Sequence, residues 1–443
     1  MGLFEENGPF RIDKNGKTLS ANPFSWNKFA SVIYLESPVG VGFSYAANNT
    51  NIVYDDETTA QENYAALKSF FKNYPKFTTT PFYTTGESYA GVYLPGLSAL
   101  LVKGIKSGDI NINYKGVSIG NGVIDKRSDL NSQLHYQYYH GGIPYSVYQT
   151  ALDLCCSGDE FQCQFSDHLT VMNNSIPWGD LSDPCYVFIV SEGANLLLNS
   201  FDPYNLYQQC WTLSYNSTTP RAPYGEDWTG INYDSTDFLN GYPCYMDDAM
   251  EAYLNNFAVR KALNIPPSVP AWAANNNIIN AYNQQVDTIT PNLLTILTNA
   301  PADFSILLYS GDVDTMVNCN NQITVAGYQT SYAFNSVEVN VLTVKGSGHF
   351  VPLDRPQQAQ QMIYNYLTKK DYSTPYNTEL VKTTTSFPSS TTPFSLSSAS
   401  STFASSTTQQ YIVPTTTKSV HGLSTSCWRI MIVSVLTHVS LII

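Results

Sequence analysis

The sequence predicts an α/β fold built on a parallel sheet, and two observations point to it. Short apolar, β-rich segments alternate with segments of helical spacing through residues 1–130, and the alternation returns over residues 249–372. Such alternation favours parallel strands, because each helix carries the chain back to the start of the next strand. The stretch between, residues 131–248, has aromatic and polar residues without clear periodicity, which indicates an inserted cap.

The regular elements follow from periodicity. Ala60, Tyr64, Leu67 and Phe71 recur at helical spacing and predict a helix over residues 58–73. The first part is expected to hold strands at 31–35, 81–85 and 115–119 and helices at 58–73 and 89–103. The second part is expected to hold helices at 249–263 and 356–368 and strands at 304–309 and 337–344.

The C-terminal part differs in composition. We expect a Ser/Thr-rich linker over residues 373–426, because more than half of residues 383–426 are Ser or Thr and cannot bury enough apolar surface to fold. The apolar tail, residues 427–443, ends in an apolar run of 14 residues. That run is shorter than the about 20 residues that span a bilayer. The tail fits a glycolipid-anchor signal or a short tail anchor, and both remain open.

Charge and cysteine placement bound the function. The net charge of −13 argues against a nucleic-acid partner, which needs clusters of Lys and Arg. Six of the eight cysteines fall between residues 155 and 244 without C-x-x-C spacing, so we expect disulfides in an oxidising compartment and no metal or cofactor. Sequons at Asn48, Asn173 and Asn216 agree with the secretory pathway. Residues 1–10 lack the features of a signal peptide, and we therefore expect the natural N-terminus to lie upstream.

The strongest motif is GESYAG at residues 86–91, between an expected strand and an expected helix. A sharp turn there exposes a serine hydroxyl and needs small neighbours, as in the nucleophile elbow of α/β-hydrolases. The helix that follows points its N-terminal N–H groups toward developing negative charge. The motif therefore predicts that Ser88 is a nucleophile.

A serine nucleophile needs a general base and a carboxylate that orients the base. α/β-Hydrolases supply these in the order Ser, Asp, His, on loops that follow strands. After Ser88, Asp314 follows the strand expected at 304–309, and His349 lies in a Gly-rich loop after the next strand. Asp312 lies in the same loop as Asp314, and we expect it to cap that loop.

Several segments, in order, resemble the serine carboxypeptidase family. The resemblance covers about residues 2–370 and implies an α/β-hydrolase fold with a disulfide-bearing cap insertion. The segments that carry it are LESPVGVGFSY (35–45), GESYAGVYLP (86–95), SIGNGVID (118–125), YLNNFAVRKALNIP (253–266), LLYSGDVD (307–314) and GSGHFVPLDRP (346–356).

The resemblance assigns roles to these residues. It makes Ser88 the nucleophile, His349 the general base and then acid, and Asp314 the carboxylate that orients His349. It also makes the backbone N–H of Tyr89 one oxyanion donor.

Glu87, directly before the nucleophile, is the unusual residue of the motif. The resemblance implies that Glu87 stays protonated and, with Glu6, grips the C-terminal carboxylate of a peptide substrate. Burial next to another carboxyl raises a pKa, so a protonated Glu is physically reasonable. The alternative is that Glu6 is a frayed terminal residue.

The resemblance also implies a disulfide framework, and the sequence departs from the family at one motif. The adjacent Cys155 and Cys156 leave two of the pairings interchangeable on sequence alone. The family motif N-G-G-P-G-C-S-S, which precedes the G-L-F segment in the family, is absent from this sequence. In the family this motif supplies a second oxyanion donor, and losing one such donor lowers the reaction rate by about two to three orders of magnitude. Without the strands of that segment, we expect an open sheet edge. The implied disulfides are Cys155–Cys185, Cys156–Cys163 and Cys210–Cys244.

The leading hypothesis is a serine exopeptidase that removes C-terminal residues from peptides at acidic pH. We expect it in the secretory pathway, outside the cell, at the cell surface or in the lysosome. Membrane attachment through the tail and a homodimer are both compatible with the sequence. Two alternatives are a non-catalytic family member acting as a surface glycoprotein, which a genuine start at Met1 would favour, and an acyltransferase on the same scaffold.

Overall fold

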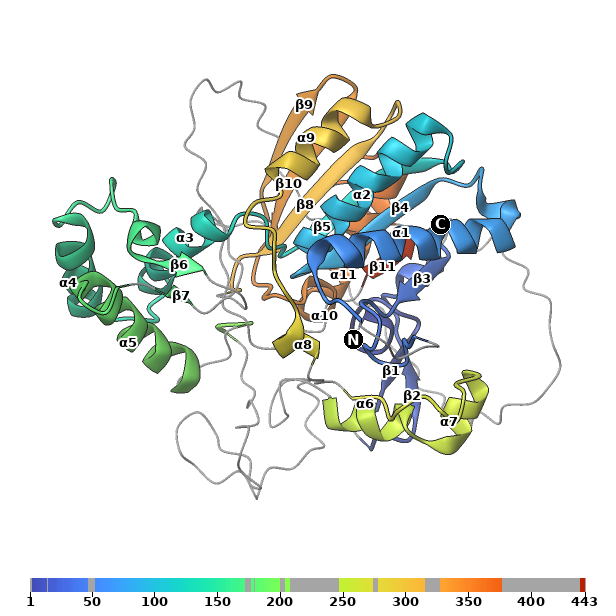
Figure 1. The fold of residues 1–443 in the computed structure, drawn as a ribbon, viewed down its shortest axis with the longest axis horizontal. Helices are drawn as coiled ribbons and strands as arrows, with labels where there is room; N and C mark the ends of the chain where they lie inside the picture. Colours follow the sequence, from blue (N-terminus) through green and yellow to red (C-terminus); the bar gives the residue numbers. More distant parts are fainter. Residues whose placement is uncertain are drawn as a thin grey trace.

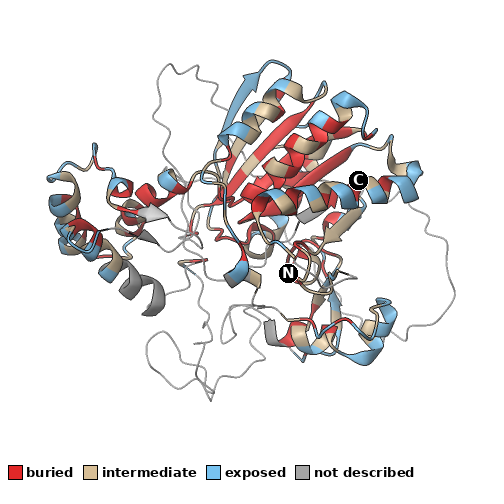
Figure 2. Ribbon diagram, viewed as in Figure 1, coloured by how far each residue is buried: buried red, intermediate tan, exposed pale blue. Residues whose placement is uncertain are grey.

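The arrangement of the chain is a sheet covered by helices, with a smaller helical part beside it. The computed structural model describes residues 2–13, 15–46, 52–171, 177–178, 180–199, 204–207, 247–273, 278–314, 327–376 and 439–442. The segment from α3 to α5 projects to one side of the sheet (Figure 1). Buried residues gather in the strands and on the helix faces that contact them (Figure 2).

A seven-stranded mixed sheet forms the centre, in the order β3-β11-β4-β5-β8-β10-β9. The neighbours β4, β5, β8 and β10 are parallel, as the sequence predicts, whereas β9 and β11 run antiparallel to their partners. The strands are β3 (Val32–Leu35), β4 (Phe82–Glu87), β5 (Tyr114–Gly120), β8 (Ser305–Gly311), β9 (Gln329–Phe334), β10 (Val337–Val344) and β11 (Val439–Ile442). Two further pairs are β1 (Phe10–Ile12) with β2 (Leu19–Ala21) and β6 (Thr170–Val171) with β7 (Pro177–Trp178).

Helices cover both faces of this sheet, because its strands are apolar on both sides. One apolar cluster joins α1, α2 and α9 to strand residues such as Phe82 and Ile306. A second cluster joins α11 to Tyr83 and Leu307, the next residue along each strand. These helices are α1 (Asp56–Asn73), α2 (Ala90–Ser107), α9 (Thr290–Asn299) and α11 (Pro356–Thr368), and the short α10 (Val351–Asp354) precedes α11.

Helix ends follow local chemistry. The Asp55 side chain accepts a hydrogen bond from the Thr58 N–H at 2.7 Å and so begins α1. Helix α2 ends at Gly108, whose φ of 78° is left-handed and suits a residue without a side chain. Residue chemistry therefore accounts for the start of α1 and the end of α2.

The cap insertion contains α3 (Lys126–Tyr139), α4 (Tyr145–Cys156), α5 (Pro184–Asn199), β6 and β7, and a 3₁₀ helix (Phe165–His168). Leu134, Tyr148 and Phe165 belong to an apolar cluster of its own. Residues 131–248 show no clear helical periodicity, so the sequence does not predict these helices. The predicted limits of the insertion fall inside helices, since α3 contains residue 131 and α6 contains residue 248. These limits stay a prediction.

The helix predicted at 249–263 is wrong as a single helix. The segment forms α6 (Asp247–Leu254) and α7 (Phe257–Ala262), and α8 (Ile278–Ala281) follows. Asn256 interrupts the helix because its side chain caps α7, accepting from the Ala258 N–H at 2.9 Å.

The last strand, β11, comes from the apolar tail and lies between β3 and β4. Leu441 and Ile442 are buried there against opposite faces of the sheet. Strand β4, which leads to Ser88, consequently has a partner on each side. Among the described residues, no helix has the length and apolar character needed to cross a membrane.

Candidate active site

Ser88 lies between the end of β4 and the start of α2 in a left-handed conformation, with φ of 63°. A residue with a side chain is strained there, and such strain recurs at functional sites. The Ser88 N–H donates to the Gly120 carbonyl oxygen at 3.0 Å, and the Ser88 carbonyl oxygen accepts from the Val123 N–H at 3.0 Å. Gly91 has no room for a side chain, because a Cβ would lie 2.3 Å from the Val123 carbonyl oxygen. The turn is thus built tightly against the end of β5.

His349 and Asp314 meet in the interior, each after a different strand. His349 Nδ1 lies 2.8 Å from Asp314 Oδ2, and the two side chains are 1% and 0% exposed. Because a carboxylate oxygen accepts, Nδ1 carries the proton and Nε2 is the basic nitrogen. Within the described residues His349 Nε2 makes no hydrogen bond, so Ser88 and His349 are not hydrogen-bonded. Such bonds are often formed only once substrate is bound.

Asn121 is a site residue that sequence reasoning missed. Its Nδ2 donates to Asp314 Oδ2 at 2.8 Å, and its Oδ1 accepts from the Gly311 N–H at 3.1 Å. Its own N–H donates to the Tyr309 carbonyl oxygen at 2.7 Å, and its φ of 39° is left-handed. Asn121 lies in the SIGNGVID segment (118–125), directly after the strand expected at 115–119, and the sequence alone assigns it no role. Its position at the carboxyl end of a central strand was the signal that could have found it.

Asp312 caps the loop that it shares with Asp314. It accepts a hydrogen bond from the Gly346 N–H, and its carbonyl oxygen accepts from the Tyr136 hydroxyl at 3.0 Å. Burial raises the pKa of the Asp312 carboxyl. Its contacts join the loops after β8 and β10, and it does not contact His349.

Glu87 is a buried carboxyl at the end of β4. Burial is the first cause that raises its pKa well above the usual value, and the charge of Glu6 is the second, followed by Asp314 and Asp354. The Val351 N–H opposes this shift by donating to the carboxyl. Glu87 Oε2 has no hydrogen-bond partner within the described residues. A carboxyl in such surroundings holds its proton and can donate a hydrogen bond.

Glu6 lies at the end of a π-helical turn, Gly2–Glu6, and is 3% exposed. It is therefore a buried residue and not a frayed terminal one. The charge of Glu6 reaches Glu87, which brings together the two carboxyls that the resemblance pairs.

Tyr89 follows Ser88 and is the N-cap residue of α2, where helix N–H groups lack intrahelical partners. Its hydroxyl donates to Asp56 Oδ1 at 2.9 Å, and its ring packs against Tyr93 and Tyr282. Burial raises the pKa of this hydroxyl well above its usual value, and so does the nearby Asp56. The side chain therefore anchors the turn that presents the Tyr89 N–H.

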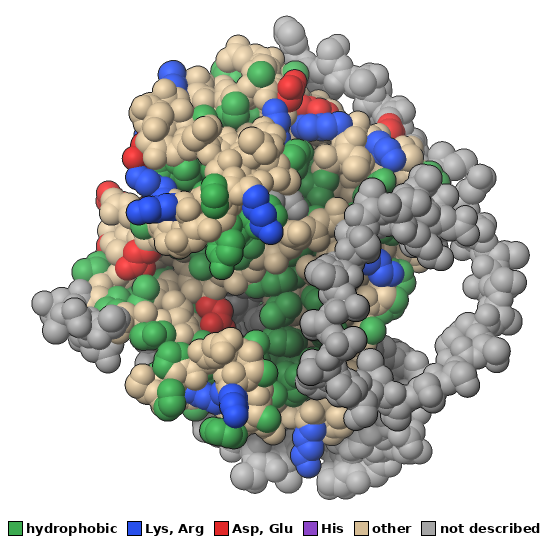
Figure 3. Space-filling model, turned by 90° about the vertical axis from the view of Figure 1, so that its right-hand side faces the viewer, with side chains coloured by type: hydrophobic (Ala, Val, Ile, Leu, Met, Phe, Trp, Pro, Cys, Tyr) green, Lys and Arg blue, Asp and Glu red, His purple; other side chains and the backbone are tan. Residues whose placement is uncertain are grey.

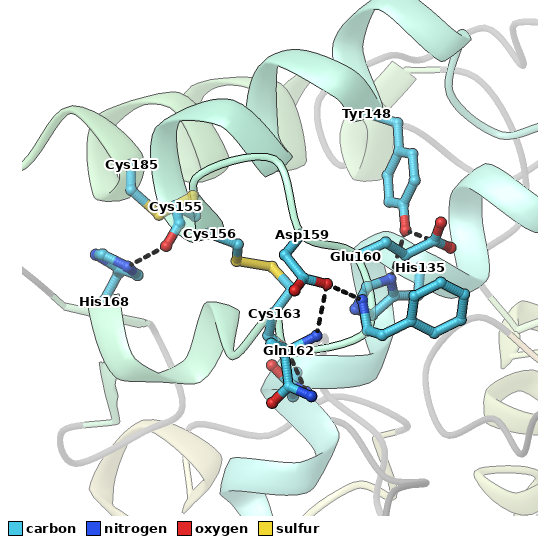
Figure 4. Close-up of a disulfide and its surroundings, with 12 residues drawn as sticks. His135, Tyr148, Cys155, Cys156, Asp159, Glu160, Gln162, Cys163, His168 and Cys185 are labelled. Atoms are coloured by element: carbon cyan, nitrogen blue, oxygen red, sulfur yellow. Dashed lines mark hydrogen bonds between the residues drawn. A yellow bond between two sulfur atoms is a disulfide. The ribbon is translucent and has the colours of Figure 1, made fainter.

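The cap insertion holds two disulfides, Cys155–Cys185 and Cys156–Cys163 (Figure 4). These are the two pairings that the resemblance implies. Cys210 and Cys244, which the resemblance also pairs, lie outside the described residues. The three sequon residues, Asn48, Asn173 and Asn216, lie outside them as well.

One group in the described part of the chain has the residue types of a metal site. His168, Asp183 and Cys185 lie close together in the cap insertion. Cys185 is bound to Cys155, and His168 Nδ1 is 2.7 Å from Asp183 Oδ2 while Nε2 is 3.0 Å from the Cys155 carbonyl oxygen (Figure 4). The ligand atoms of all three side chains are thus engaged within the protein, and the arrangement is that of a structural contact.

The distribution of basic side chains is also visible on one face. Lys and Arg lie dispersed over the face shown in Figure 3 and do not gather into one continuous patch.

Known serine carboxypeptidases are similar to this chain in sequence. The sequence model of the serine carboxypeptidase family matches residues 1–325 and 320–369. A Caenorhabditis elegans serine carboxypeptidase, ctsa-4.1, is 34% identical over 422 residues, which cover 84% of this chain and 82% of the relative. The mouse lysosomal protective protein is 32% identical, with the same coverage of 84% and 82%.

A solved structure is similar in fold. Kex1(delta)p, a prohormone-processing carboxypeptidase from Saccharomyces cerevisiae, superposes with a TM-score of 0.55 at 18% identity. The similarity covers 83% of this chain and 80% of that one, and it confirms the fold class that the sequence predicts.

Proposed function

The chain belongs to the serine carboxypeptidase family, and we propose that it releases C-terminal residues from peptides with Ser88, His349 and Asp314 as its triad. The observation that carries the proposal is the buried hydrogen bond between His349 and Asp314. The strained left-handed turn at Ser88 supports it, because that turn is what exposes a serine hydroxyl at the end of a strand.

The proposed reaction proceeds through an acyl-enzyme. His349 Nε2 takes the proton of the Ser88 hydroxyl while Ser88 Oγ attacks the scissile carbonyl carbon. The Tyr89 N–H donates to the oxyanion of the tetrahedral intermediate. His349 then gives the proton to the leaving amine, and the peptide bond breaks. Water, deprotonated by His349, then attacks the acyl carbon, and His349 returns this proton to Ser88 Oγ as the ester bond breaks and the shortened peptide leaves.

The carboxyl pair supplies the preference for chain ends. In the proposal, neutral Glu87 donates a hydrogen bond to the substrate's C-terminal carboxylate, and Glu6 shares in this contact. The raised pKa of Glu87 and its unpartnered Oε2 support this role. An ionised Glu87 would repel the same carboxylate, so the contact requires the proton, and we propose that the enzyme acts at acidic pH.

The two cap disulfides support a secretory location, because disulfides persist in oxidising compartments. We propose an extracellular, cell-surface or lysosomal protein whose partners are peptides with a free C-terminus. Glycosylation at the three sequons remains part of this proposal. The expected membrane attachment through residues 427–443 does not fit the sheet, because β11 (Val439–Ile442) is paired with β3 and β4 and its Leu441 and Ile442 are buried.

The nucleophile is tested with a fluorophosphonate probe, which reacts with activated serines. We expect a full-length form that carries an N-G-G-P-G-C-S-S segment to be labelled, and Ser88→Ala in that form to lose the labelling. Ser98→Ala is the matched control, since Ser98 lies on α2 and its hydroxyl contacts the Tyr114 hydroxyl at 2.6 Å. Undiminished labelling of Ser88→Ala would remove Ser88 as nucleophile. A wild-type chain that is never labelled and releases no residue would favour a non-catalytic surface glycoprotein.

A further inference from the structure

Residues 204–207, here called the clamp segment, come from the cap insertion but contact both loops of the proposed triad. The His349 N–H donates to the Tyr204 carbonyl oxygen at 2.7 Å. Two residues later, the Leu206 N–H donates to the carbonyl oxygen of Val313, next to Asp314, at 3.0 Å. The clamp segment thus forms one backbone hydrogen bond with His349 and one with Val313, the residue before Asp314.

The partly buried carboxyl of Asp354 links the clamp segment to the His349 loop a second time. Asp354, at the end of α10, accepts from Asn205 Nδ2 at 3.0 Å and from the Gly348 N–H at 2.8 Å, both at Oδ2. Asn205 is 7% exposed, and its Oδ1 accepts from the Tyr207 N–H at 3.1 Å. The Asn205 side chain therefore bridges its own segment to Asp354, and Asp354 bridges to the residue before His349.

The clamp segment and the His349 loop pack too closely to admit a side chain at two glycines. A Cβ on Gly348 would lie 2.1 Å from the Tyr204 carbonyl oxygen and 2.9 Å from Asp354 Oδ2. A Cβ on Gly311 would lie 2.1 Å from the Gly348 carbonyl oxygen. The Tyr204 ring centroid is 4.9 Å from that of His349. The clamp segment therefore contacts the His349 loop through the backbone and the ring of Tyr204, and it is linked to that loop through the Asn205 side chain and Asp354.

We propose that the clamp segment, through Asn205 and Asp354, is a positioning element that holds His349 at hydrogen-bonding distance from Asp314. The proposal rests on the proposed function for its kinetic consequence. His349 and Asp314 follow different strands, β10 and β8, so their 2.8 Å separation depends on how the two loops are held together. Small displacements of catalytic groups cost rate far more than they cost substrate binding.

The test compares Asn205→Ala with Tyr207→Ala. Tyr207 is in the same segment, and its side chain is 66% exposed and outside the bridge. For a blocked dipeptide, we expect Asn205→Ala to lower kcat about tenfold with KM within about twofold, since positioning acts on the reacting geometry. Tyr207→Ala should match wild type in both constants. If Asn205→Ala does not fold, Asn205→Ser, whose hydroxyl is too short to reach Asp354, replaces it.

A second measurement does not depend on activity. The His349 Nδ1 proton, held against Asp314, should give a low-field ¹H NMR signal that is lost in Asp314→Ala. In Asn205→Ala this signal should broaden or disappear, and in Tyr207→Ala it should persist. A chain in which Ser88 proves not to be the nucleophile would defeat the proposed function, yet this signal would still report on the clamp segment.

A double-mutant cycle separates positioning from general stability. If Asn205 acts through Asp354, adding Asn205→Ala to Asp354→Asn should cost clearly less than the about tenfold expected in the wild-type background. Equal losses in both backgrounds, or an unchanged kcat together with an unchanged low-field signal in Asn205→Ala, would overturn the proposal.

Discussion

Asp314 follows β8 and Glu87 ends β4, and these two strands lie on either side of β5 in one sheet. Both are buried carboxyl groups, but their surroundings differ. Asp314 Oδ2 receives hydrogen bonds from His349 and from Asn121. Glu87 faces other acidic groups, Glu6 first among them, and one of its oxygens has no partner among the described residues. Burial alone therefore does not decide what a carboxyl does: its neighbours make Asp314 an acceptor, whereas the raised pKa of Glu87 supports the donor role that we propose for it.

The same chemical change should have unequal effects at the two positions. Replacing Asp314 by Asn removes the negative charge that fixes the His349 tautomer, and we expect kcat to fall about 10⁴-fold. Glu87→Gln keeps a neutral, hydrogen-bonding group and should leave kcat at acidic pH within about tenfold. Steady-state hydrolysis of a blocked dipeptide at pH 5 measures both. Equal losses would mean that the two carboxyls do not differ as described.

A second prediction concerns Asn121, which donates a hydrogen bond to the Asp314 carboxylate. Asn121→Ala removes one donor to the Asp314 carboxylate, and hydrogen bonds to charged groups are worth enough for an about 10- to 100-fold loss in kcat. Asn113→Ala is the control, because its amide donates to the Thr79 carbonyl oxygen at the surface. If both variants kept wild-type kcat, Asn121 would have only a structural role.

The pH dependence of the stability of the fold tests whether Glu87 is protonated. Burial raises the pKa of Glu87 above 4.5 and that of Asp354 from 3.8 to about 6, so the folded state keeps protons that the unfolded chain has lost. Stability from these groups is therefore lost as pH rises through the folded pKa values. His168 adds to this trend: burial lowers the pKa of its imidazole, but the hydrogen bonds to Asp183 and to the Cys155 carbonyl oxygen, with the charges of Asp183 and Asp167, together raise that pKa.

Between pH 5 and pH 8, His135 opposes this trend. Burial lowers the pKa of His135 from 6.5 to about 4, which removes stability as pH falls through that range. We expect the two carboxyls to outweigh it, giving a higher Tm at pH 5 than at pH 8, and Glu87→Gln to reduce the difference. A thermal melt that is independent of pH in wild type would contradict the raised pKa of Glu87.

Regular elements of the sheet region were predictable because their periodicity is local. Strand β10 and helix α11 have the bounds that the sequence predicts, whereas the helix at 249–263 divides at the capping Asn256. Ser88, Asp314 and His349 could be named because each stands at a recognisable strand end. The cap helices have no such pattern, since their own small cluster and two disulfides hold them.

The missed site residues share a physical cause. Asn121 contacts Asp314 across 193 positions of the chain, and Asn205 contacts Asp354 across 149. Neither contact follows from spacing or propensity, because each depends on how the sheet order and the cap insertion bring distant loops together. Tail strand β11 was missed for the same reason, since its place between β3 and β4 is set by pairing alone.

The most direct test of the central claim is the pH dependence of KM for a blocked dipeptide and for its C-terminal amide. If neutral Glu87 grips the substrate carboxylate, KM for the dipeptide should rise as pH increases and the proton is lost, while KM for the amide stays nearly constant. Glu87→Gln should abolish the rise, because an amide has no proton to lose in this range. Parallel KM profiles for the two substrates in wild type would contradict the account and leave Glu87 a structural residue.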